Sequence, residues 1–377
     1  MNITIVVRDF WEDQMTALPK LAYELAKKSK HKIQILTDSK INRTSNMRGI
    51  KIVYSTNIIR YLMLDPDIDM IHYIGGVFGA LQILNKIRNK RLLFSVITNQ
   101  INMLEVIKSL KLKDLLKLRV NVFLLYAISL SFLKRYLLQK DAIFVFSNNR
   151  SRNLGGEKSK IRLIEIGLNS KEYIKCNKEK VNRLRNKLKI PKNKKIISYI
   201  GHDYLSRGID NLIKVFSQLD ESFFLLLLLN KMPDGDIEKV RRLLRPVKPD
   251  RYILITEYVK NIKEYYHLID ILVLNYRNPC ELPVFPLVLC EGLGSGTNVI
   301  VSKIGDIPEL VSDGYNGYLI SPNNLKELYN KIIEVANLKK DEVGLNAKNS
   351  VKRLDWKIIS RKYEDIYNEL KSSKKTF

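Results

Sequence analysis

Short runs of apolar residues alternate with segments of helical periodicity along the whole chain. The clearest run, FFLLLLL, is apolar throughout instead of alternating with polar residues. Such runs are typical of parallel strands that are covered by helices on both faces. We therefore predict strands at residues 3–7, 32–37, 70–74, 92–97, 142–147 and 161–166, and, in the second half, at 195–200, 223–229, 252–256, 271–274, 298–301 and 317–320.

Amphipathic helical segments separate these runs, for example at residues 18–28, 209–219, 325–336 and 356–370. The β–α alternation predicts an α/β protein with doubly wound parallel sheets. The alternation occurs twice, and a Lys- and Asn-rich stretch separates its two occurrences. This suggests two domains, as does the length of 377 residues at about 150 residues per domain. The predicted organisation is an N-terminal domain at 1–170, a linker at 171–194, a C-terminal domain at 195–350, and a terminal helix and tail at 351–377.

One segment, residues 106–138, departs from this alternation. Its apolar part, 120–133, is 14 residues long, shorter than the roughly 20 residues that a bilayer-spanning helix needs. Basic residues flank it on both sides: Lys108, Lys111, Lys113, Lys117, Arg119, Lys134 and Arg135. A basic amphipathic helix followed by an apolar one is typical of an element that lies in the membrane interface. The alternative is a buried helix of the first domain beside a solvated basic one.

The net charge of +26 is unevenly distributed along the chain. Residues 1–190 carry 36 basic and 15 acidic side chains, whereas residues 191–377 carry 29 and 24. The basic half suggests an anionic partner: a membrane surface, nucleic acid or a polyanionic substrate. A general lysine bias is the alternative. Three cysteines without a CxxC pair, and an N-terminus without a signal-peptide pattern, lead us to expect a cytoplasmic protein.

Most of the candidate functional residues lie between residues 271 and 323. A loop with Glu281 and two prolines follows a predicted strand, and a helix is predicted to start near Pro286 and to stop at Gly294-Ser-Gly296. Proline is favourable at a helix start, and the free N–H groups there attract anions. Glu291, one turn into this helix, could accept hydrogen bonds from the sugar hydroxyls of a nucleotide. The pattern predicts a nucleotide-binding element.

These residues, and others along the chain, resemble segments of a known protein family. PLVLCEGLGSGTNVIVSKIGDIPELVSDGYNGYLI resembles the donor-binding run of family 4 glycosyltransferases, retaining enzymes of the GT-B fold. IISYIGHDYLSRGIDNLIKVF is similar to the strand–Gly-Arg–loop–Lys-Gly–helix element of that family, and LDWKIISRKYEDIYNEL to its terminal helix. The resemblance is strong over residues 195–370 and weak over 1–140. It implies two Rossmann-like domains facing a cleft, with the C-terminal helix crossing back to the first domain.

The resemblance also implies roles for individual residues. Glu291 would hold the nucleotide ribose. Arg207, in place of the family's lysine, would contact the diphosphate, and Glu281 would be the nearest candidate for the first of the family's two glutamates. The other implied donor-binding residues are Gly201, His202, Tyr258, Phe285, Pro286, Leu287 and Val288. No metal or other cofactor is implied, because fixed cations take the place of a metal at the diphosphate.

The sequence departs from the family pattern in four places, one of which is the segment RDFWEDQMT, where the family has a glycine-rich loop after the first strand. The spacing of the family places its first glutamate at position 283, which is Pro283 here. The family's Gly-Arg pair is replaced by Gly201-His202, and its Thr-x-His pattern by a segment that ends in Ile97. These departures put turnover in question and leave the expected fold unchanged.

The expected function is that of a metal-independent retaining glycosyltransferase. It would move a hexose-type sugar from a UDP- or GDP-sugar to a saccharide or lipid-linked acceptor, and it would lie peripherally on the inner face of the cell membrane. One alternative is an inactive glycosyltransferase-like partner protein. A second is a basic nucleic-acid-binding protein, although the chain has no helix-turn-helix, finger or RNP-like pattern. A sugar-nucleotide epimerase, which shares the two-domain fold, is a minor enzyme alternative.

Overall fold

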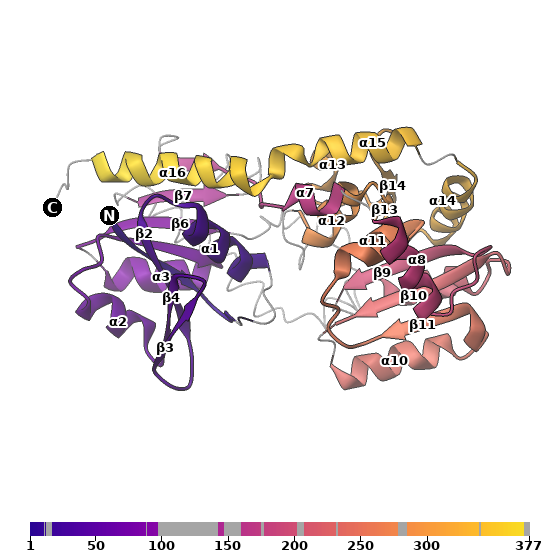
Figure 1. Cartoon of the computed structure of the whole chain (residues 1–377), viewed down its shortest axis with the longest axis horizontal. Coiled ribbons are helices and arrows are strands. Elements are labelled where there is room, and N and C mark those ends of the chain that lie inside the picture. The colour runs from indigo at the N-terminus through magenta and orange to yellow at the C-terminus, as the bar shows by residue number, and fades with distance from the viewer. Residues whose placement is uncertain are drawn as a thin grey trace, which may run out of the picture. The chain divides into compact units, whose positions relative to one another are not determined.

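A computed structural model describes most of the chain. The described residues are 1–10, 12, 17–87, 89–96, 142–146, 160–174, 177–201, 207–230, 233–277, 285–338 and 341–372. They form two compact units: the first holds the described residues up to Gly167 together with those from Trp356 onward, and the second holds Leu168–Asp355 (Figure 1).

The first unit is built on an eight-stranded sheet in the order β3-β4-β2-β1-β5-β6-β7-β8. Neighbouring strands are parallel except for β3 and β4, which are antiparallel. The strands are β1 (Asn2–Val7), β2 (Lys32–Asp38), β3 (Arg43–Met47), β4 (Ile50–Ser55), β5 (Met70–Gly75), β6 (Arg91–Val96), β7 (Ala142–Phe146) and β8 (Ile161–Leu163).

The sequence pattern did not predict the β3–β4 hairpin. Arg48 and Gly49, between its strands, have φ angles of 52° and 88°, and positive φ at both central residues is the geometry of a tight hairpin turn. Strand β3, RTSNM, has no buried residue and no apolar run. It lies at the edge of the sheet, where a polar strand can pair without burying side chains, so hydrophobic periodicity gives no signal for it.

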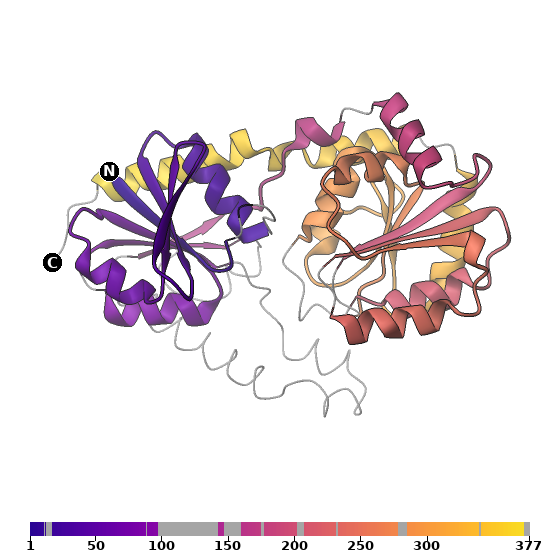
Figure 2. The same cartoon turned by 60° about the horizontal axis from the view of Figure 1, so that its bottom comes forward.

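Helices cover both faces of this sheet (Figures 1 and 2). One face packs against α1 (Ala17–Lys28) and α16 (Trp356–Ser372), and the other against α2 (Ile58–Leu64) and α3 (Val77–Lys86). Burial on both faces explains why the central strands are continuously apolar. The prediction that the C-terminal helix returns to the first domain is confirmed, because α16 supplies part of this core.

A buried hydrogen-bonded network ties α16 to the sheet. His72, on β5, has its Nδ1 2.8 Å from the Tyr367 hydroxyl and its Nε2 2.7 Å from Ser95 Oγ on β6. Ser95 Oγ in turn lies 2.9 Å from the Tyr363 hydroxyl. All four side chains are buried, so each hydrogen bond replaces one that water would make in the unfolded chain. The network therefore specifies where α16 sits along the sheet.

This network predicts a pH dependence of stability. Burial lowers the pKa of His72 to about 3, whereas a histidine in an unfolded chain titrates near 6.5. Between these values the unfolded state binds a proton that the folded state does not, so stability falls as the pH drops below about 6.5. From pH 7 to 5, the free energy of unfolding of the wild type should decrease by about 2 kcal/mol more than that of His72→Gln, which does not titrate. Denaturant unfolding at several pH values measures both slopes, and equal slopes would contradict the assignment.

The second unit has a six-stranded parallel sheet in the order β11-β10-β9-β12-β13-β14. The strands are β9 (Lys195–Gly201), β10 (Phe223–Leu229), β11 (Tyr252–Ile255), β12 (Ile271–Leu274), β13 (Asn298–Ser302) and β14 (Tyr318–Ile320). The order is that of the dinucleotide-binding Rossmann fold, in which ligands bind at the carboxyl ends of the strands where the order reverses. Here that point lies between β9 and β12.

Helices also cover both faces of the second sheet (Figure 2). Those packed on one core are α9 (Ile209–Phe216), α10 (Asp234–Leu244) and α14 (Leu325–Asn337). The others are α7 (Ser170–Ile174), α8 (Lys178–Lys187), α11 (Ile262–Leu268), α12 (Leu287–Ser295), α13 (Ile307–Leu310) and α15 (Asp341–Ser350), with short 3₁₀ helices at Pro249–Arg251 and Lys352–Leu354. Both units are thus α/β layers around parallel sheets, as predicted.

The chain passes between the units earlier than the expected linker. It enters the second unit at Leu168, whose N–H donates to the carbonyl of Leu354 at 2.7 Å, and leaves it after Asp355. Residues 171–194 contain α7 and α8, which belong to the second unit. Helix α8 packs on α11 and has no buried residue. Its Lys- and Asn-rich composition therefore reflects a solvent-facing helix, with Asn177 as its N-cap.

Candidate functional site

The strand order of the second sheet reverses between β9 and β12. Two predicted site residues, Gly201 and Arg207, lie at the carboxyl edge of the sheet at this point. Strand β9 ends at Gly201, and β12 ends at Leu274 and continues into Asn275 and Tyr276. Because the carboxyl ends of parallel strands meet at the same edge of a sheet, these residues border the position where such folds bind ligands. Arg207 belongs to the same edge, since it directly precedes the N-cap of α9, the helix that follows β9.

Arg207 is a buried cation at this edge. Its side chain is 8% exposed, and its guanidinium carbon lies 5.0 Å from the centre of the Tyr276 ring. Burial raises the pKa of Tyr276 to about 12, although the nearby charge of Arg207 and their hydrogen bond act to lower it. A buried guanidinium with five donors suits the bidentate recognition of phosphate oxygens.

Gly208 sets the direction in which the chain leaves Arg207. It is the N-cap of α9 and has a φ of 69°. A Cβ at this position would lie 2.4 Å from the backbone oxygen of Asn275, whose side-chain amide donates to the Gly208 carbonyl at 2.8 Å. Both the positive φ and the close approach require glycine. The backbone therefore requires a glycine directly after Arg207.

A second arginine, which was not predicted as a site residue, lies at the same edge. Arg277, three residues after β12, donates through Nη2 to both carboxylate oxygens of Asp210 and to Asn211 Oδ1 at 3.3 Å. Asp210 and Asn211 lie in the first turn of α9. The position of Arg277 just beyond the end of a buried parallel strand is the signal that could have found it.

The predicted helix start near position 286 is confirmed. Helix α12 begins at Leu287 after Pro286 and ends at Ser295, with Gly296 as its C-cap at a φ of 72°. Phe285 and Pro286 are buried, while Leu287 and Val288 are partly exposed. The first N–H groups of a helix lack acceptors within it, so those of Leu287 and Val288 can donate to an anion. That they do so in this protein stays a prediction.

Glu291 is a buried carboxylate held by two tyrosines. Its side chain lies in α12 and is 6% exposed. Its Oε1 accepts from the Tyr173 hydroxyl at 2.6 Å, and its Oε2 accepts from the Tyr266 hydroxyl at 2.8 Å. Burial and the charge of Glu291 raise the pKa of both phenols, so they remain protonated donors. Glu291 was predicted from the sequence, whereas the two tyrosines that bind it were not.

The other predicted site residues are placed as follows. Tyr258 lies on the loop after β11 and is 43% exposed. Glu281 and His202 lie outside the described residues, as do Pro283, Ile97 and the segment 106–138. Among the described residues, no group of three or more His, Cys, Asp or Glu side chains is arranged to hold a metal ion.

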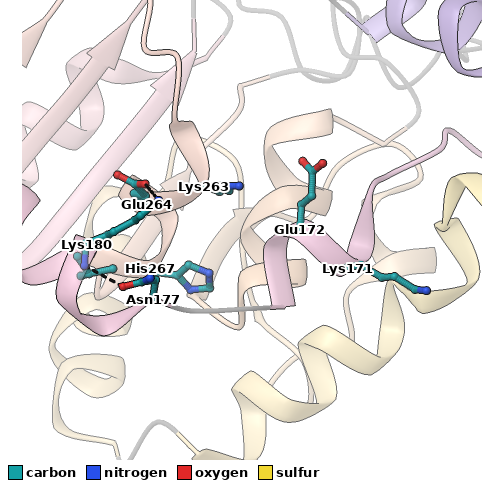
Figure 3. Close-up of a pocket in the computed structure, with 8 residues that line it drawn as sticks. Lys171, Glu172, Asn177, Lys180, Lys263, Glu264 and His267 are labelled. Carbon is teal, nitrogen blue, oxygen red and sulfur yellow. Dashed lines mark hydrogen bonds and ion pairs between the residues drawn. The ribbon is translucent and has the colours of Figure 1, made fainter.

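A cavity of about 620 Å³ lies between α7, α8 and α11 (Figure 3). Lys180 Nζ and Glu264 Oε1, on its walls, are 3.9 Å apart, and the backbone N–H of Lys180 donates to Oδ1 of Asn177, the N-cap of α8. Its lining also includes Lys171, Glu172, Val181, Lys263 and His267. None of these is a predicted donor-binding residue. Tyr173 and Tyr266 lie on α7 and α11, which border the cavity, and Arg207 is not among its lining residues.

Solved structures define the class of the fold. The chain is similar to sucrose-phosphate synthase from Thermosynechococcus elongatus, with a TM-score of 0.77, 17% identity, and coverage of 99% of this chain and 100% of that one. It is also similar to Anabaena HepE in complex with UDP and glucose, with a TM-score of 0.73, 14% identity, and coverage of 98% and 100%. The protein has the GT-B glycosyltransferase fold, as predicted.

Sequence relatives refine this assignment. Residues 180–350 match the family model of glycosyl transferases group 1. An uncharacterized glycosyltransferase of Methanocaldococcus jannaschii is 26% identical over 185 residues, 46% of this chain and 47% of that protein. The D-inositol 3-phosphate glycosyltransferase of Corynebacterium aurimucosum is 23% identical over 232 residues, 56% of this chain and 52% of that protein. The chain thus spans about half the length of these relatives, and the matches support a group 1 glycosyltransferase.

Proposed function

We propose that this protein is a metal-independent retaining glycosyltransferase of family 4 that uses a UDP- or GDP-sugar. One observation carries the proposal: the unit that contains the match to the group 1 model has a buried arginine at the carboxyl edge of its sheet and a buried glutamate in α12, the helix that follows β12. HepE, a structural neighbour, has been solved with UDP-glucose. That likeness supports a nucleotide-sugar donor here.

In the proposed mechanism, each group has one physical task. The Arg207 guanidinium and the N–H groups at the start of α12 neutralise the donor diphosphate, Glu291 accepts from the ribose, and Tyr258 lies against the base. As the bond between the sugar and the diphosphate breaks, negative charge grows on the leaving phosphate. Cations and dipoles already in place stabilise that charge without reorganisation. Glu281 is proposed to act near the transferred sugar.

Calorimetry with a panel of UDP-, GDP- and ADP-sugars, with and without EDTA, tests the proposal. We expect one nucleotide-sugar to bind equally well in both conditions, with slow release of the nucleoside diphosphate. Binding that EDTA abolishes would contradict the metal-independent mechanism. Tight donor binding without transfer to any acceptor tested would favour the inactive partner protein. Binding of no donor would overturn the donor assignment.

The acceptor is proposed to be a saccharide or lipid-linked sugar at the cytosolic face of the membrane. This proposal rests on the net charge of residues 1–190 and on the sequence pattern of residues 106–138. In the described part of the chain, no helix combines the length and the apolar character needed to cross a membrane.

Replacing Lys108, Lys111, Lys113 and Lys117 by glutamine should release the protein from vesicles that contain anionic lipids. Each basic residue near such a surface contributes about 1 kcal/mol of attraction. Co-sedimentation with anionic and with neutral vesicles measures the effect, and raised salt should weaken the binding of the wild type. Unchanged sedimentation of the variant would favour the alternative of a buried helix.

A further inference from the structure

The positive charge of the second unit is concentrated in one short stretch of the chain. Residues 171–195 hold 11 basic and 2 acidic side chains, whereas residues 196–355, the rest of the unit after this stretch, hold 20 and 21. Part of the positive charge counted in residues 1–190 therefore belongs to the second unit. A lysine bias that acted evenly along the chain would not leave the rest of the unit without a positive excess.

The described basic residues of this stretch lie on an exposed surface. Helix α8 packs on α11 and has no buried residue, and the chain then turns at residues 188–194 into β9. We call the exposed basic residues of the helix and of this turn the basic face: Lys178, Lys180, Arg183, Lys187, Lys189 and Lys192.

Arg185 joins the turn to the helix. Its Nη2 donates to the backbone carbonyls of Pro191 at 2.7 Å, Lys192 at 3.3 Å and Lys194 at 2.6 Å. These hydrogen bonds hold the turn against the last turn of α8, where Arg185 and Lys187 lie. The lysines of the turn and those of the helix are thus parts of one surface.

The protein itself offsets little of this charge. Glu179 lies 3.2 Å from Arg183, and Glu264, on α11, lies 3.9 Å from Lys180. Like charges without such partners repel one another and lower the stability of the folded chain, a cost that an anionic partner removes. Four lysines of the basic face form no ion pair with the described part of the chain: Lys178, Lys187, Lys189 and Lys192.

The composition of the basic face fits a membrane surface better than a nucleic acid. No aromatic residue occurs between Tyr173 and Tyr199, which are both buried, whereas proteins that bind single strands stack the bases on aromatic side chains. Lysines outnumber arginines on the face by five to one. A lysine acts as a point charge, whereas the planar fork of arginine suits directional recognition of phosphates and bases. A layer of anionic headgroups is a diffuse charge that needs no such recognition.

We propose that the basic face docks the second unit on a membrane surface that carries anionic phospholipids. The inference rests on the membrane location in the proposed function and adds a contact in the second unit, distinct from the segment 106–138. No valine, leucine or isoleucine of α8 or of the turn after it is exposed. The contact is therefore electrostatic, without insertion into the bilayer, and raised salt reverses it.

The test compares two variants of equal charge in the whole chain. The face variant replaces the four lysines without an ion pair: Lys178→Gln, Lys187→Gln, Lys189→Gln and Lys192→Gln. The control variant replaces four exposed basic residues on or next to α9, α10 and α14, the helices of the other core: Lys214→Gln, Arg242→Gln, Arg245→Gln and Lys326→Gln.

Co-sedimentation at low and at high salt measures binding to vesicles of phosphatidylcholine, alone and mixed with phosphatidylglycerol. At low salt, the face variant should bind the mixed vesicles at least about 100-fold more weakly than the wild type, because each lysine near an anionic surface contributes about fivefold. The control variant should bind like the wild type. An equal loss in both variants would mean that only the net charge of the protein matters and would overturn the proposal.

Acetylation of lysines in the wild type locates the contact without any substitution, so the test does not depend on the folding of the variants. Mixed vesicles should slow the acetylation of the four lysines of the face variant, as read by mass spectrometry, and leave that of Lys214 and Lys326 unchanged. Equal acetylation of the four lysines with and without vesicles would overturn the proposal.

The outcomes separate this inference from the proposed function. If the face variant binds like the wild type while the glutamine variant in the segment 106–138 does not, this inference fails and the proposed membrane location stands. A wild type that binds no mixed vesicle would overturn both, while calorimetry with nucleotide-sugars would still decide the donor assignment. If the wild type binds an oligonucleotide and the face variant loses only that binding, the face serves a nucleic acid and the proposal is overturned.

Discussion

Replacing Glu291 with alanine should abolish most sugar transfer and also destabilise the protein. The activity is lost because the donor ribose loses its acceptor. Stability is lost because the buried hydroxyls of Tyr173 and Tyr266 lose the carboxylate oxygens to which they donate, and an unsatisfied buried polar group costs about 1–3 kcal/mol. Thermal unfolding and a transfer assay measure the two effects on the same sample.

Glu291→Gln is the matched variant for this prediction. It keeps the shape of the side chain, and its amide can both accept from one tyrosine and donate to the other. We expect its melting temperature to lie closer to that of the wild type than that of the alanine variant does, while donor binding is still weakened because one acceptor oxygen is gone. Wild-type transfer by both variants would show that Glu291 is a structural residue only.

Replacing Arg207 with alanine should lower the transfer rate by about 10²–10³-fold, the usual effect of removing a group that stabilises developing charge. Arg207 is buried at the carboxyl edge of the second sheet, where a positive charge is little screened by water. The loss should appear in kcat as well as in the donor KM, because the charge on the diphosphate grows as the bond breaks. Steady-state kinetics, with the nucleotide-sugar that the calorimetric panel identifies as the donor, measures both parameters.

Arg207→Lys and Arg242→Ala complete this experiment. The lysine variant keeps the charge and loses the planar fork, so it should retain an intermediate rate. Arg242 is exposed on α10, and its removal should leave the rate unchanged. If Arg207→Ala transfers sugar as fast as Arg242→Ala does, Arg207 does not contact the diphosphate.

Much of the fold followed from the sequence because buried parallel strands have a strong local signal. Strand β10 is FFLLLLL and is buried at all seven positions, so its apolar run and its environment agree. Strand β3 is polar and lies at an edge, so its pairing depends on β4 and on the turn at Gly49. Residues 171–194 were expected to be a linker for a similar reason. Helix α8 in this segment is polar and packs on α11 with few apolar side chains, so its sequence resembles that of a linker.

The candidate site was predictable where its residues belong to one local motif. Arg207-Gly208 and Glu291 each stand at a helix start or one turn into a helix, and such positions can be recognised from turn and helix signals. The resemblance to family 4 glycosyltransferases then implied their roles. The position of Arg277 just after β12 is a local signal, but its contact with Asp210, 67 residues away in the sequence, is not.

The sequence alone determined that this chain forms two parallel α/β sheets and that Arg207 and Glu291 follow strands of the second one, because periodicity and turn chemistry are local properties. Only the tertiary structure decided what surrounds them. Tyr173 and Glu291 are 118 residues apart, and they meet because α7 packs on α12. Likewise His72 meets Tyr367 across 295 residues because α16 returns to the first sheet. Such contacts depend on how separate elements pack, and no short segment of the chain contains that information.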